Sequence, residues 1–292
     1  MNTMYIKKIE LIKELRKYFE DLGAIEVFTP VSRKTCADII SRVPAGEGRF
    51  LRNCQESYMR LFTPVYGNVF EIGPSFRPEE SEDTTHGIEF MLLEAQFMHK
   101  DLSFLMTLLK GFIEMKRKDF HCEKISVYQI IKERTGIDLI NEGEEKLIEF
   151  LQNKYPKFFY KQNYELVNLY ISNEIEPLSK NRCIFFYEYP ACTLSLARYC
   201  EKTKEIVQRF ELFINGIEVS NGYVYSDNIE EYIYRNKKVN LFTTEEEYLA
   251  EQFKSGVISM DACVVGIGIE RLCMVLNDLK DIRVILRENE VF

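Results

Sequence analysis

Residues 209–219 read RFELFINGIEV, and this stretch decides which kind of fold the chain can adopt. Two strand-like runs flank Asn215-Gly216, the dipeptide that most favours a two-residue type I′ turn between antiparallel strands. With that turn, Glu211 and Glu218 lie on one face of the hairpin as diagonal neighbours. The sequence therefore predicts an antiparallel sheet that carries two neighbouring carboxylates.

Such neighbours lie roughly 7–8 Å apart at Cα, a distance across which two carboxylates can share a divalent cation or approach one that is bound to phosphate. Magnesium with a nucleotide is the natural occupant of such a site. In the alternative interpretation, both side chains are solvated carboxylates on an exposed sheet face. The local pattern leaves both interpretations open.

Strand and helix patterns alternate along the rest of the chain, and no repeat, linker or break in composition separates them. Apolar spacing and turn residues give the boundaries. The predicted strands cover residues 24–28, 69–77, 88–97 and 183–190, the predicted helices cover 9–22 and 102–118, and a mixed helical region continues to about 178. We therefore predict an α+β fold, a single domain over residues 1–292, built on a mostly antiparallel sheet flanked by helices.

The composition limits the kinds of function. A net charge of −8 argues against a broad basic surface for nucleic acid. The eight cysteines form no CxxC pair and the first residues lack the apolar core of a signal peptide, so we expect reduced thiols in a cytoplasmic protein. The three histidines lack zinc-ligand spacing, and no apolar run approaches the ~20 residues of a membrane span.

Residues 89–97 read EFMLLEAQF, a strand with two different faces. Alternation puts Phe90, Glu94 and Gln96 on one face, opposite a face that is plainly core. An aromatic ring, a carboxylate and an amide suit the floor of a ligand pocket. The pattern alone favours the alternative, an edge strand with one exposed face.

Residues 266–271 read GIGIER, where a predicted strand turns into a helix. Glycines at a helix start can admit a phosphate close to the backbone. As a dinucleotide fingerprint the match is weak, because the third glycine is replaced and no βαβ unit surrounds it. Equally, the glycines serve only a tight turn. Arg271, on the first helical turn, adds a cation in either case.

Together these segments resemble the three motifs of the class II aminoacyl-tRNA synthetase catalytic domain, and specifically its lysyl branch. FEDLGAIEVFTP (19–30) is similar to motif 1, FRPEESEDTTHGIEFMLLE (76–94) to motif 2 and GIGIERL (266–272) to motif 3. Between them, RFELFINGIEVSNGY (209–223) resembles the lysyl-type segment that carries metal-binding glutamates. The resemblance covers nearly the whole chain and implies a class II synthetase-like antiparallel sheet.

Motif 1 begins within the first thirty residues, so we expect no anticodon-binding domain. The chain resembles free-standing paralogues of the catalytic core, typified by the ligase that attaches β-lysine to a lysine of elongation factor P. The resemblance implies ATP-dependent activation of an amino acid as an aminoacyl-adenylate, with transfer to a non-tRNA acceptor such as a protein lysine. Motif 1 also implies a closed, two-fold homodimer.

The resemblance assigns nucleotide-binding roles to individual residues. Arg77 matches the motif 2 arginine that holds the ATP α-phosphate and the amino-acid carboxylate, and Arg271 matches the motif 3 arginine on the γ-phosphate; both are the expected catalytic residues. Glu79 matches the residue that reads the adenine amine, His86 the loop residue near the γ-phosphate and Phe90 the ring under adenine. The magnesium ligands correspond to Glu211 and Glu218.

Five residues match amino-acid contacts of the family: Glu56, Glu94, Gln96, Asn221 and Tyr225. Glu56 aligns with the glutamate that binds the α-amine, and Glu94 with one of the acids that grip a lysine ε-ammonium. Asn221 needs a β-bulge, since simple alternation points it away from Glu218.

The ammonium site departs from the family at two positions. Gln96 stands where the family has Tyr, and Tyr225 where it has a second Glu. Removing one carboxylate leaves a buried ammonium less compensated, and an unpaired buried charge can cost ~3–5 kcal/mol. A smaller, less basic or uncharged polar amino acid therefore competes with lysine and β-lysine as the expected substrate.

The motif 2 loop carries Glu80, Glu82 and Asp83 without a basic residue. In synthetases this loop touches the acceptor end of tRNA, and acids there repel phosphates. We therefore expect an acceptor other than tRNA, such as a protein resembling elongation factor P. Two alternatives stay open: a catalytically degenerate paralogue that regulates by binding an amino acid or nucleotide, and an ammonia-using amide synthetase.

Overall fold

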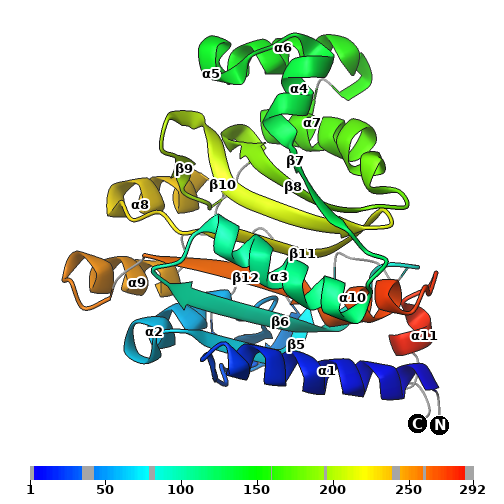
Figure 1. Ribbon diagram of the computed structural model, residues 1–292. Coiled ribbons are helices and arrows are strands. Elements are labelled where there is room, and N and C mark those ends of the chain that lie inside the picture. Colours follow the sequence, from blue (N-terminus) through cyan, green and yellow to red (C-terminus); the bar gives the residue numbers. More distant parts are fainter. Residues whose placement is uncertain are drawn as a thin grey trace. The chain divides into compact units, whose positions relative to one another are not determined.

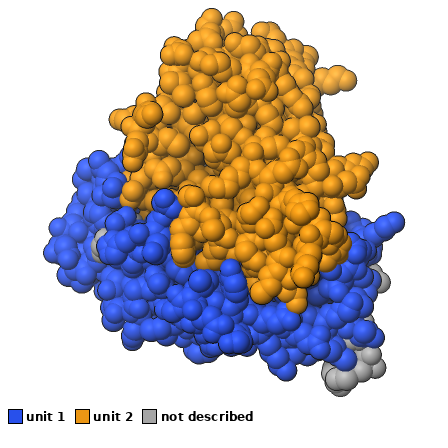
Figure 2. Space-filling model, in the orientation of Figure 1, with its two compact units in different colours: residues 1–101, 227–292 blue, residues 102–226 orange. Residues whose placement is uncertain are grey.

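The computed structural model describes residues 3–34, 43–78, 83–158, 160–193, 196–238, 244–258 and 261–286. Contacts within the chain divide it into two compact units, which Figure 2 colours separately. Unit 1 consists of residues 1–101 and 227–292, and unit 2 of residues 102–226. The single domain over residues 1–292 stays a prediction, and each unit is described by itself below.

Unit 1 is built on a four-stranded sheet in the order β1-β5-β6-β12 (Figure 1). The strands are β1 (Ile25–Glu26), β5 (Val69–Phe76), β6 (Glu89–Met98) and β12 (Ala262–Gly268). β1 runs parallel to β5, and the other neighbours are antiparallel. A second, small sheet has the order β2-β4-β3, with β2 at Ser32–Arg33, β3 at Val43–Gly46 and β4 at Arg49–Leu51.

Helices of unit 1 cover both faces of β6. The long helix α1 (Thr3–Asp21) buries its apolar stripe, and the Phe19 ring lies 5.6 Å from Phe70 and 6.1 Å from Phe97. α2 (Glu56–Tyr66) packs on the other face, where Thr63 meets Gln96. The expectation of an exposed edge strand is therefore wrong: β6 lies between β5 and β12, and Glu94 and Gln96 are buried.

The remaining helices of unit 1 follow unit 2 in the chain. They are α8 (Ile229–Lys238), α9 (Thr244–Lys254), α10 (Ile269–Leu276) and α11 (Arg283–Leu286). The predicted glycine turn before α10 is wrong, because Gly266 and Gly268 are paired strand residues opposite Glu94 and Leu92. β12 therefore passes directly into the helix, with Gly268 as its N-cap.

Buried ion pairs fix the framework of unit 1. Arg52 Nη1 lies 2.6 Å from Glu71 Oε1, and both side chains are almost fully buried. Gly73 makes room for this pair, since a Cβ there would lie 2.1 Å from Arg52 Nη2. Lys8 of α1 lies 2.6 Å from Glu270 of α10, whose carboxylate also accepts the Met91 N–H of β6. The pairs tie helices to strands that are distant in sequence.

Unit 2 joins a second set of strands to a helical layer. Its strands are β7 (Cys122–Ser126), β8 (Cys183–Pro190), β9 (Tyr199–Cys200), β10 (Thr203–Ile214) and β11 (Ile217–Val224). The order is β7-β8-β10-β11, with β9 also on β10. Only β7 and β8 run parallel; the remaining pairs in this unit are antiparallel among the strands described.

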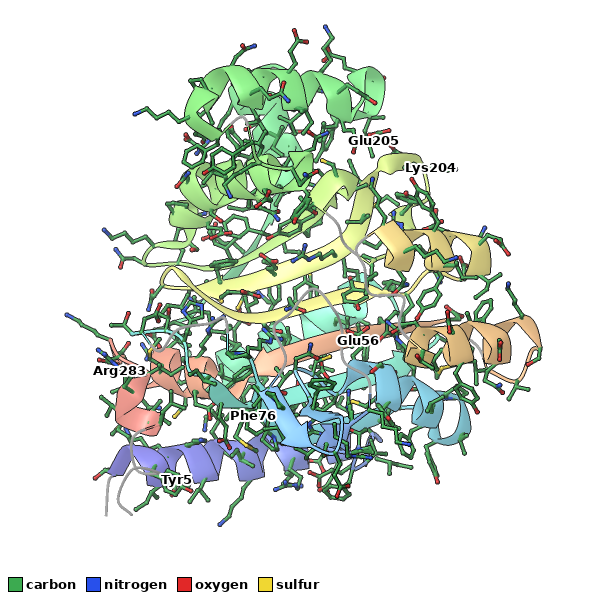
Figure 3. The ribbon with its side chains drawn as sticks, turned by 180° about the vertical axis from the view of Figure 1, so that it is seen from behind. Tyr5, Glu56, Phe76, Lys204, Glu205 and Arg283 are labelled. Carbon is green, nitrogen blue, oxygen red and sulfur yellow. The ribbon has the colours of Figure 1, made fainter. Side chains whose placement is uncertain are left out.

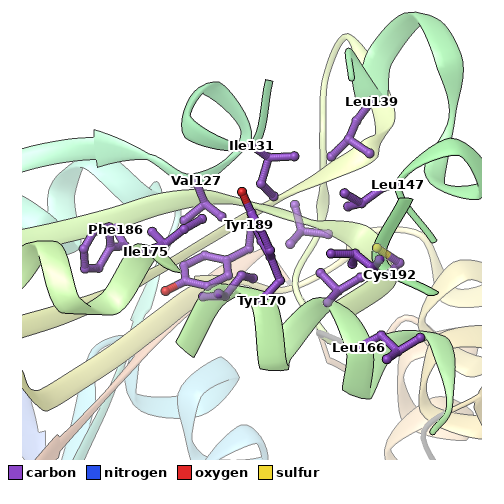
Figure 4. Close-up of a cluster of buried hydrophobic side chains, with 14 of the residues drawn as sticks. Val127, Ile131, Leu139, Leu147, Leu166, Tyr170, Ile175, Phe186, Tyr189 and Cys192 are labelled. Carbon is purple, nitrogen blue, oxygen red and sulfur yellow. The ribbon is translucent and has the colours of Figure 1, made fainter. Parts of the chain in front are cut away.

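The helical layer of unit 2 packs on this sheet through one core. Besides α3 (Leu102–Lys116), which contributes none of the described residues of this core, the helical segments are α4 (Val127–Thr135), α5 (Leu139–Glu142), α6 (Glu144–Lys154), α7 (Asn163–Tyr170) and the short turns η1 (Pro156–Phe158), η2 (Ile171–Ile175), η3 (Glu176–Ser179) and η4 (Ala191–Thr193). Figure 4 shows their apolar side chains meeting Phe186 and Tyr189 of β8. Glu188 has a φ of 57°, and a register shift there keeps Tyr189 on the core face.

The prediction of an α+β fold with a mostly antiparallel sheet is confirmed, and the predicted strands at 69–77, 88–97 and 183–190 agree to about one residue. The predicted strand over 24–28 shortens to the two residues of β1. The short strand β7 and the three-stranded sheet were not predicted. No helix among the described residues has both the length and the apolar character that a membrane span requires.

Candidate functional site

The β10–β11 hairpin has the predicted turn and the predicted bulge. Asn215 and Gly216 have φ values of 53° and 84°, as a type I′ turn demands. The register shifts by one residue between Leu212 and Phe213. As a result, Glu211 pairs with Asn221, while Phe213 pairs with Glu218. Because of this bulge, Glu218 and Asn221 share a face with Glu211.

A pocket of about 470 Å³ opens on this face within unit 2. Its polar lining includes Glu176, Tyr189, Arg209, Glu211, Glu218 and Asn221. The Glu211 carboxylate accepts a 2.7 Å hydrogen bond from the Tyr189 hydroxyl and pairs with Arg209, whose guanidinium lies 4.8 Å from the Tyr189 ring centre. Glu211 is only 9% exposed, so the alternative of a solvated sheet face is wrong for this residue.

Sequence reasoning missed Glu176, a third carboxyl group of the pocket. Burial, and next the charge of Glu211, raise the pKa of Glu176 to about 7, although Ser172 donates a 3.1 Å hydrogen bond to it. Glu176 lies in the helical region before β8, where no local pattern marks a site. The pocket therefore has more negative charge than the hairpin alone supplies.

The donor set of this pocket fits magnesium. Mg²⁺ keeps several waters and binds through one or two carboxylates plus substrate phosphates, so Glu211 and Glu218 suffice. Glu176 lines the same pocket, and burial, followed by the charge of Glu211, raises its pKa to about 7. No cluster of three or more His, Cys, Asp and Glu side chains in the described parts of the chain has the arrangement of a protein-only metal site.

In unit 1, Arg77 follows β5 directly and faces an aromatic ring. Its guanidinium lies 5.2 Å from the centre of the Phe90 ring, and its Nε donates to the Asn53 carbonyl at 3.4 Å. The Arg77 N–H donates to the Ile88 carbonyl at 2.8 Å. This hydrogen bond holds Arg77 just after the end of β5 and opposite the residue before β6. An arginine beside a partly buried ring suits a bound nucleotide, with one group for charge and one for stacking.

His86 and Arg271 meet at the described end of the motif 2 loop. Arg271 Nε donates to the Thr85 carbonyl at 3.0 Å. His86 Nδ1 lies 3.0 Å from the Asp83 carboxylate, whose hydrogen bonds to the Thr85 N–H and to His86 hold the pKa of Asp83 well below its usual range. The structure thus brings two predicted phosphate contacts to one loop. Glu79 lies outside the described residues.

Glu94 is a buried carboxyl group of β6, and its side chain contacts the residue before α2. It is 6% exposed, and its Oε2 accepts the Gln55 N–H at 2.5 Å. The pKa of Glu94 is raised to about 7, mainly by burial and secondly by the charge of Glu56. The hydrogen bond from the Gln55 N–H and the charge of Arg77 lower this pKa by smaller amounts. The segment 53–56 therefore contacts Arg77 through the Asn53 carbonyl and Glu94 through the Gln55 N–H.

Glu56 begins α2 and is the second acid of this region (Figure 3). Its carboxylate pairs with Arg60, one helical turn further on. Asn53, which sequence reasoning missed, is 4% exposed and its Nδ2 has no hydrogen-bond partner among the described residues. The Asn53 carbonyl is the group that binds Arg77, so a buried donor lies in the segment that links the predicted contacts.

Gln96 and Tyr225 are buried side chains that contact neighbouring residues of their own units. The Gln96 Nε2 donates to the Glu56 carbonyl at 3.0 Å and its Oε1 accepts from Thr63 at 2.6 Å, which fastens α2 to β6. Tyr225 of unit 2 is 1% exposed, and its ring packs edge-on against Tyr223 at 5.5 Å. Tyr223 lines the pocket of unit 2, and Tyr225 is not among the described residues that line it.

Comparison with known proteins shows what the chain is similar to. The family model described as tRNA synthetases class II (D, K and N) matches residues 1–287. Lysine–tRNA ligase 2 of Methanosarcina acetivorans is 28% identical over 315 residues, which cover 97% of this chain and 61% of that protein. An elongation factor P–(R)-β-lysine ligase of Haemophilus influenzae is 28% identical over 302 residues, which cover 95% of this chain and 92% of that protein. The chain thus spans less than two thirds of the tRNA ligase.

Proposed function

Because the chain belongs to the class II tRNA synthetases (D, K and N), we propose that it is an ATP-dependent, AMP-forming amino-acid ligase. It activates an amino acid as an aminoacyl-adenylate and passes the acyl group to an acceptor other than tRNA. The observation that carries the proposal is the segment 53–56 of unit 1. It contacts Arg77 through the Asn53 carbonyl and Glu94 through the Gln55 N–H, and it ends at Glu56.

This arrangement supports binding of a zwitterion. Arg77 carries the positive charge that an amino-acid carboxylate and an ATP α-phosphate both need, while Glu56 and Glu94 supply negative charge for ammonium groups. The pKa of Glu94, which burial and next the charge of Glu56 raise to about 7, suits a site that gains from an incoming cation. The Arg77 guanidinium would bind both the substrate carboxylate and the α-phosphate, and it would thereby position the two reacting groups next to each other.

The proposed reaction has two steps. In the first, a carboxylate oxygen attacks the α-phosphorus, the new O–P bond forms and pyrophosphate leaves. Arg77 balances the charge at the α-phosphate, Arg271 and His86 bind the γ-phosphate end, and Phe90 stacks on adenine. In the second step an acceptor amine attacks the acyl carbon and AMP leaves. We assign Glu79 to the adenine amine from the resemblance alone.

Magnesium would supply charge neutralisation for the phosphates when it is bound. We assign Glu211 and Glu218 to hold it, on the strength of their shared pocket. Tyr189 and Arg209 orient Glu211 through their direct contacts with its carboxylate. Asn221, brought beside Glu218 by the bulge with Nδ2 at 3.5 Å from its Oε1, is assigned to the amino acid. Gln96 and Tyr225 are assigned to shaping the amino-acid site.

The named relatives guide the choice of substrate and acceptor. The relatives include lysine–tRNA ligases and elongation factor P–(R)-β-lysine ligases, and the latter match nearly over their full length. We therefore propose lysine or β-lysine as the first amino acids to test and a protein resembling elongation factor P as the acceptor. The acidic motif 2 loop, with an ionised Asp83, weighs against tRNA.

We also propose a homodimer in the cytoplasm. The segment that resembles motif 1 exposes large apolar side chains: Leu22 at 39%, Ile25 at 49% and Phe28 at 76%. Exposed apolar residues that gather on one segment mark an interaction surface more often than scattered ones do. β1 also lies at the edge of the unit 1 sheet, where a second chain can approach.

The test is amino-acid-dependent exchange between ATP and pyrophosphate in the presence of magnesium, run across the common amino acids, β-lysine and ornithine. We expect exchange with one of them and its loss in Arg77→Ala. The matched control is Arg117→Ala, which removes an arginine paired with Asp119 on the surface. Acyl transfer is then followed with a protein resembling elongation factor P and with tRNA.

A folded protein that binds ATP and supports no exchange with any amino acid would contradict the ligase. That result would favour a degenerate paralogue that regulates by binding. Transfer to tRNA alone would contradict the proposed acceptor and leave the adenylate chemistry standing.

A further inference from the structure

Arg60 connects the start of α2 to two helices from the far end of the chain. Its Nη2 donates to the Glu56 carboxylate, one helical turn earlier. Its Nη1 donates to Glu246 Oε2 of α9 at 3.2 Å and to the Tyr232 hydroxyl of α8. The guanidinium also lies 5.3 Å from the centre of the Tyr232 ring. One side chain thus bridges three helices of unit 1.

The bridge is buried at its Arg60, Glu246 and Tyr232 side chains. Arg60 is 3% exposed, Glu246 7% and Tyr232 2%, while the Glu56 side chain keeps 17% exposure. Two carboxylates, those of Glu56 and Glu246, share the Arg60 guanidinium. Burial raises the pKa of Glu246 to about 7, with Arg60 opposing and Glu56 adding to the shift.

We propose that Arg60 is a positioning residue that couples the amino-acid site to the docking of α8 and α9, so that binding of the substrate α-ammonium at Glu56 stabilises both helices against α2. The inference rests on the proposed function for the role of Glu56, and on the observed contacts of Arg60 for the bridge itself. Arg60 holds Glu56 in the orientation that a substrate meets, and Glu246 and Tyr232 hold Arg60 from the other side. By linkage, helices that dock better also improve amino-acid binding.

Three substitutions separate the parts of the bridge. Arg60→Met keeps the length and removes both ion pairs, Arg60→Lys keeps the charge and loses the forked geometry, and Glu246→Gln removes the compensating charge. In pyrophosphate exchange we expect Arg60→Met to raise the KM for the amino acid by about 10- to 100-fold, as loss of a charged hydrogen bond does, with the KM for ATP nearly unchanged. Arg60→Lys should restore part of the loss, and Glu246→Gln should raise the same KM more weakly.

Amide hydrogen exchange supplies the readout for the helices. In the unliganded protein, Arg60→Met should speed exchange along α8 and α9 and leave α1 unchanged. In the wild type, the amino acid that supports pyrophosphate exchange should slow exchange in α8 and α9, and this protection should be lost in Arg60→Met. The matched control is Arg49→Met, which removes a partly buried guanidinium bound to Ser32 and should do neither.

The outcomes distinguish this inference from the proposed function. If Arg60→Met lowers kcat or the active fraction while the KM for the amino acid stays at the wild-type value, the coupling is overturned and Arg60 is only structural. Unchanged amide exchange in α8 and α9 would overturn the bridge in the same way. A wild type with no pyrophosphate exchange would overturn the ligase instead, and amide exchange in the unliganded protein would still decide whether Arg60 holds the helices.

Discussion

The Glu94 carboxyl group shows at the scale of one residue how a buried carboxyl group costs stability. Burial, and next the charge of Glu56, raise its pKa to about 7, so the folded protein holds a proton that the unfolded chain releases near its ordinary pKa. Stability from this group is therefore fully present below the unfolded pKa and is lost as the pH rises through about 7. An amide at this position removes that loss.

We predict that Glu94→Gln stabilises the unliganded protein, and that its advantage over wild type grows by about 2 kcal/mol from pH 5 to pH 8. Urea unfolding at the two pH values measures this difference. Glu89→Gln, on the exposed end of the same strand, is the control and should show no such growth. The same Glu94→Gln variant should lose exchange activity with a basic amino acid. Equal stability differences at both pH values would contradict the argument.

How far single residues could be predicted depended on the distance of their partners along the chain. Glu211 and Glu218 could be placed on one face because the turn between them fixes the register, whereas Asn221 joins them only through the bulge that the family resemblance required. Arg60 could not be predicted, since its partners Tyr232 and Glu246 follow 172 and 186 residues later. No local pattern encodes such contacts, and only the folded chain brings them together.

At the scale of elements, the β10–β11 hairpin is encoded locally and the β8–β10 pairing is not. The Asn-Gly dipeptide predicts a type I′ turn, and the need to bring Asn221 beside Glu218 predicts the bulge. The second register shift depends on a positive φ at Glu188, a residue with no sequence preference for it. That shift puts Tyr189 on the face of Glu211. The hydrogen bond from Tyr189 to Glu211 in the pocket therefore depends on backbone geometry that the local sequence does not predict.

The turn of the hairpin allows a prediction about its backbone alone. Gly216 has a φ of 84°, and a Cβ there would meet no atom within 4 Å. We therefore predict that Gly216→Ala destabilises the protein by about 1–2 kcal/mol through left-handed strain without any steric clash. Asn215→Gly, at the neighbouring position of the same turn, should change stability by less than about 0.5 kcal/mol. Denaturant unfolding of both variants measures the contrast, and a similar cost for both would contradict it.

At the scale of the whole molecule, the proposed dimer depends on the α1–β1 segment. Val27 is buried while Phe28, the next residue, is 76% exposed, so the chain just after β1 turns one apolar side chain in and its neighbour out. An aromatic ring held in water beside an edge strand is a cost that a second subunit would remove. The two-fold arrangement would double each contact, because the same patch serves both partners.

We predict that Phe28→Asp turns the dimer into a monomer while each chain keeps its stability, since an exposed position tolerates a polar residue within about 0.5 kcal/mol. Sedimentation velocity over a range of protein concentrations gives the mass, and thermal unfolding of the isolated monomer checks the fold. Val65→Asp is the matched control, because Val65 is exposed to 72% on α2 and should leave the dimer intact. A wild type that sediments as a monomer at every concentration would contradict the dimer, and a Phe28→Asp protein that stays dimeric would move the interface elsewhere. Activity of the monomer then shows whether the site of each chain works alone, because every residue assigned to it here comes from one chain.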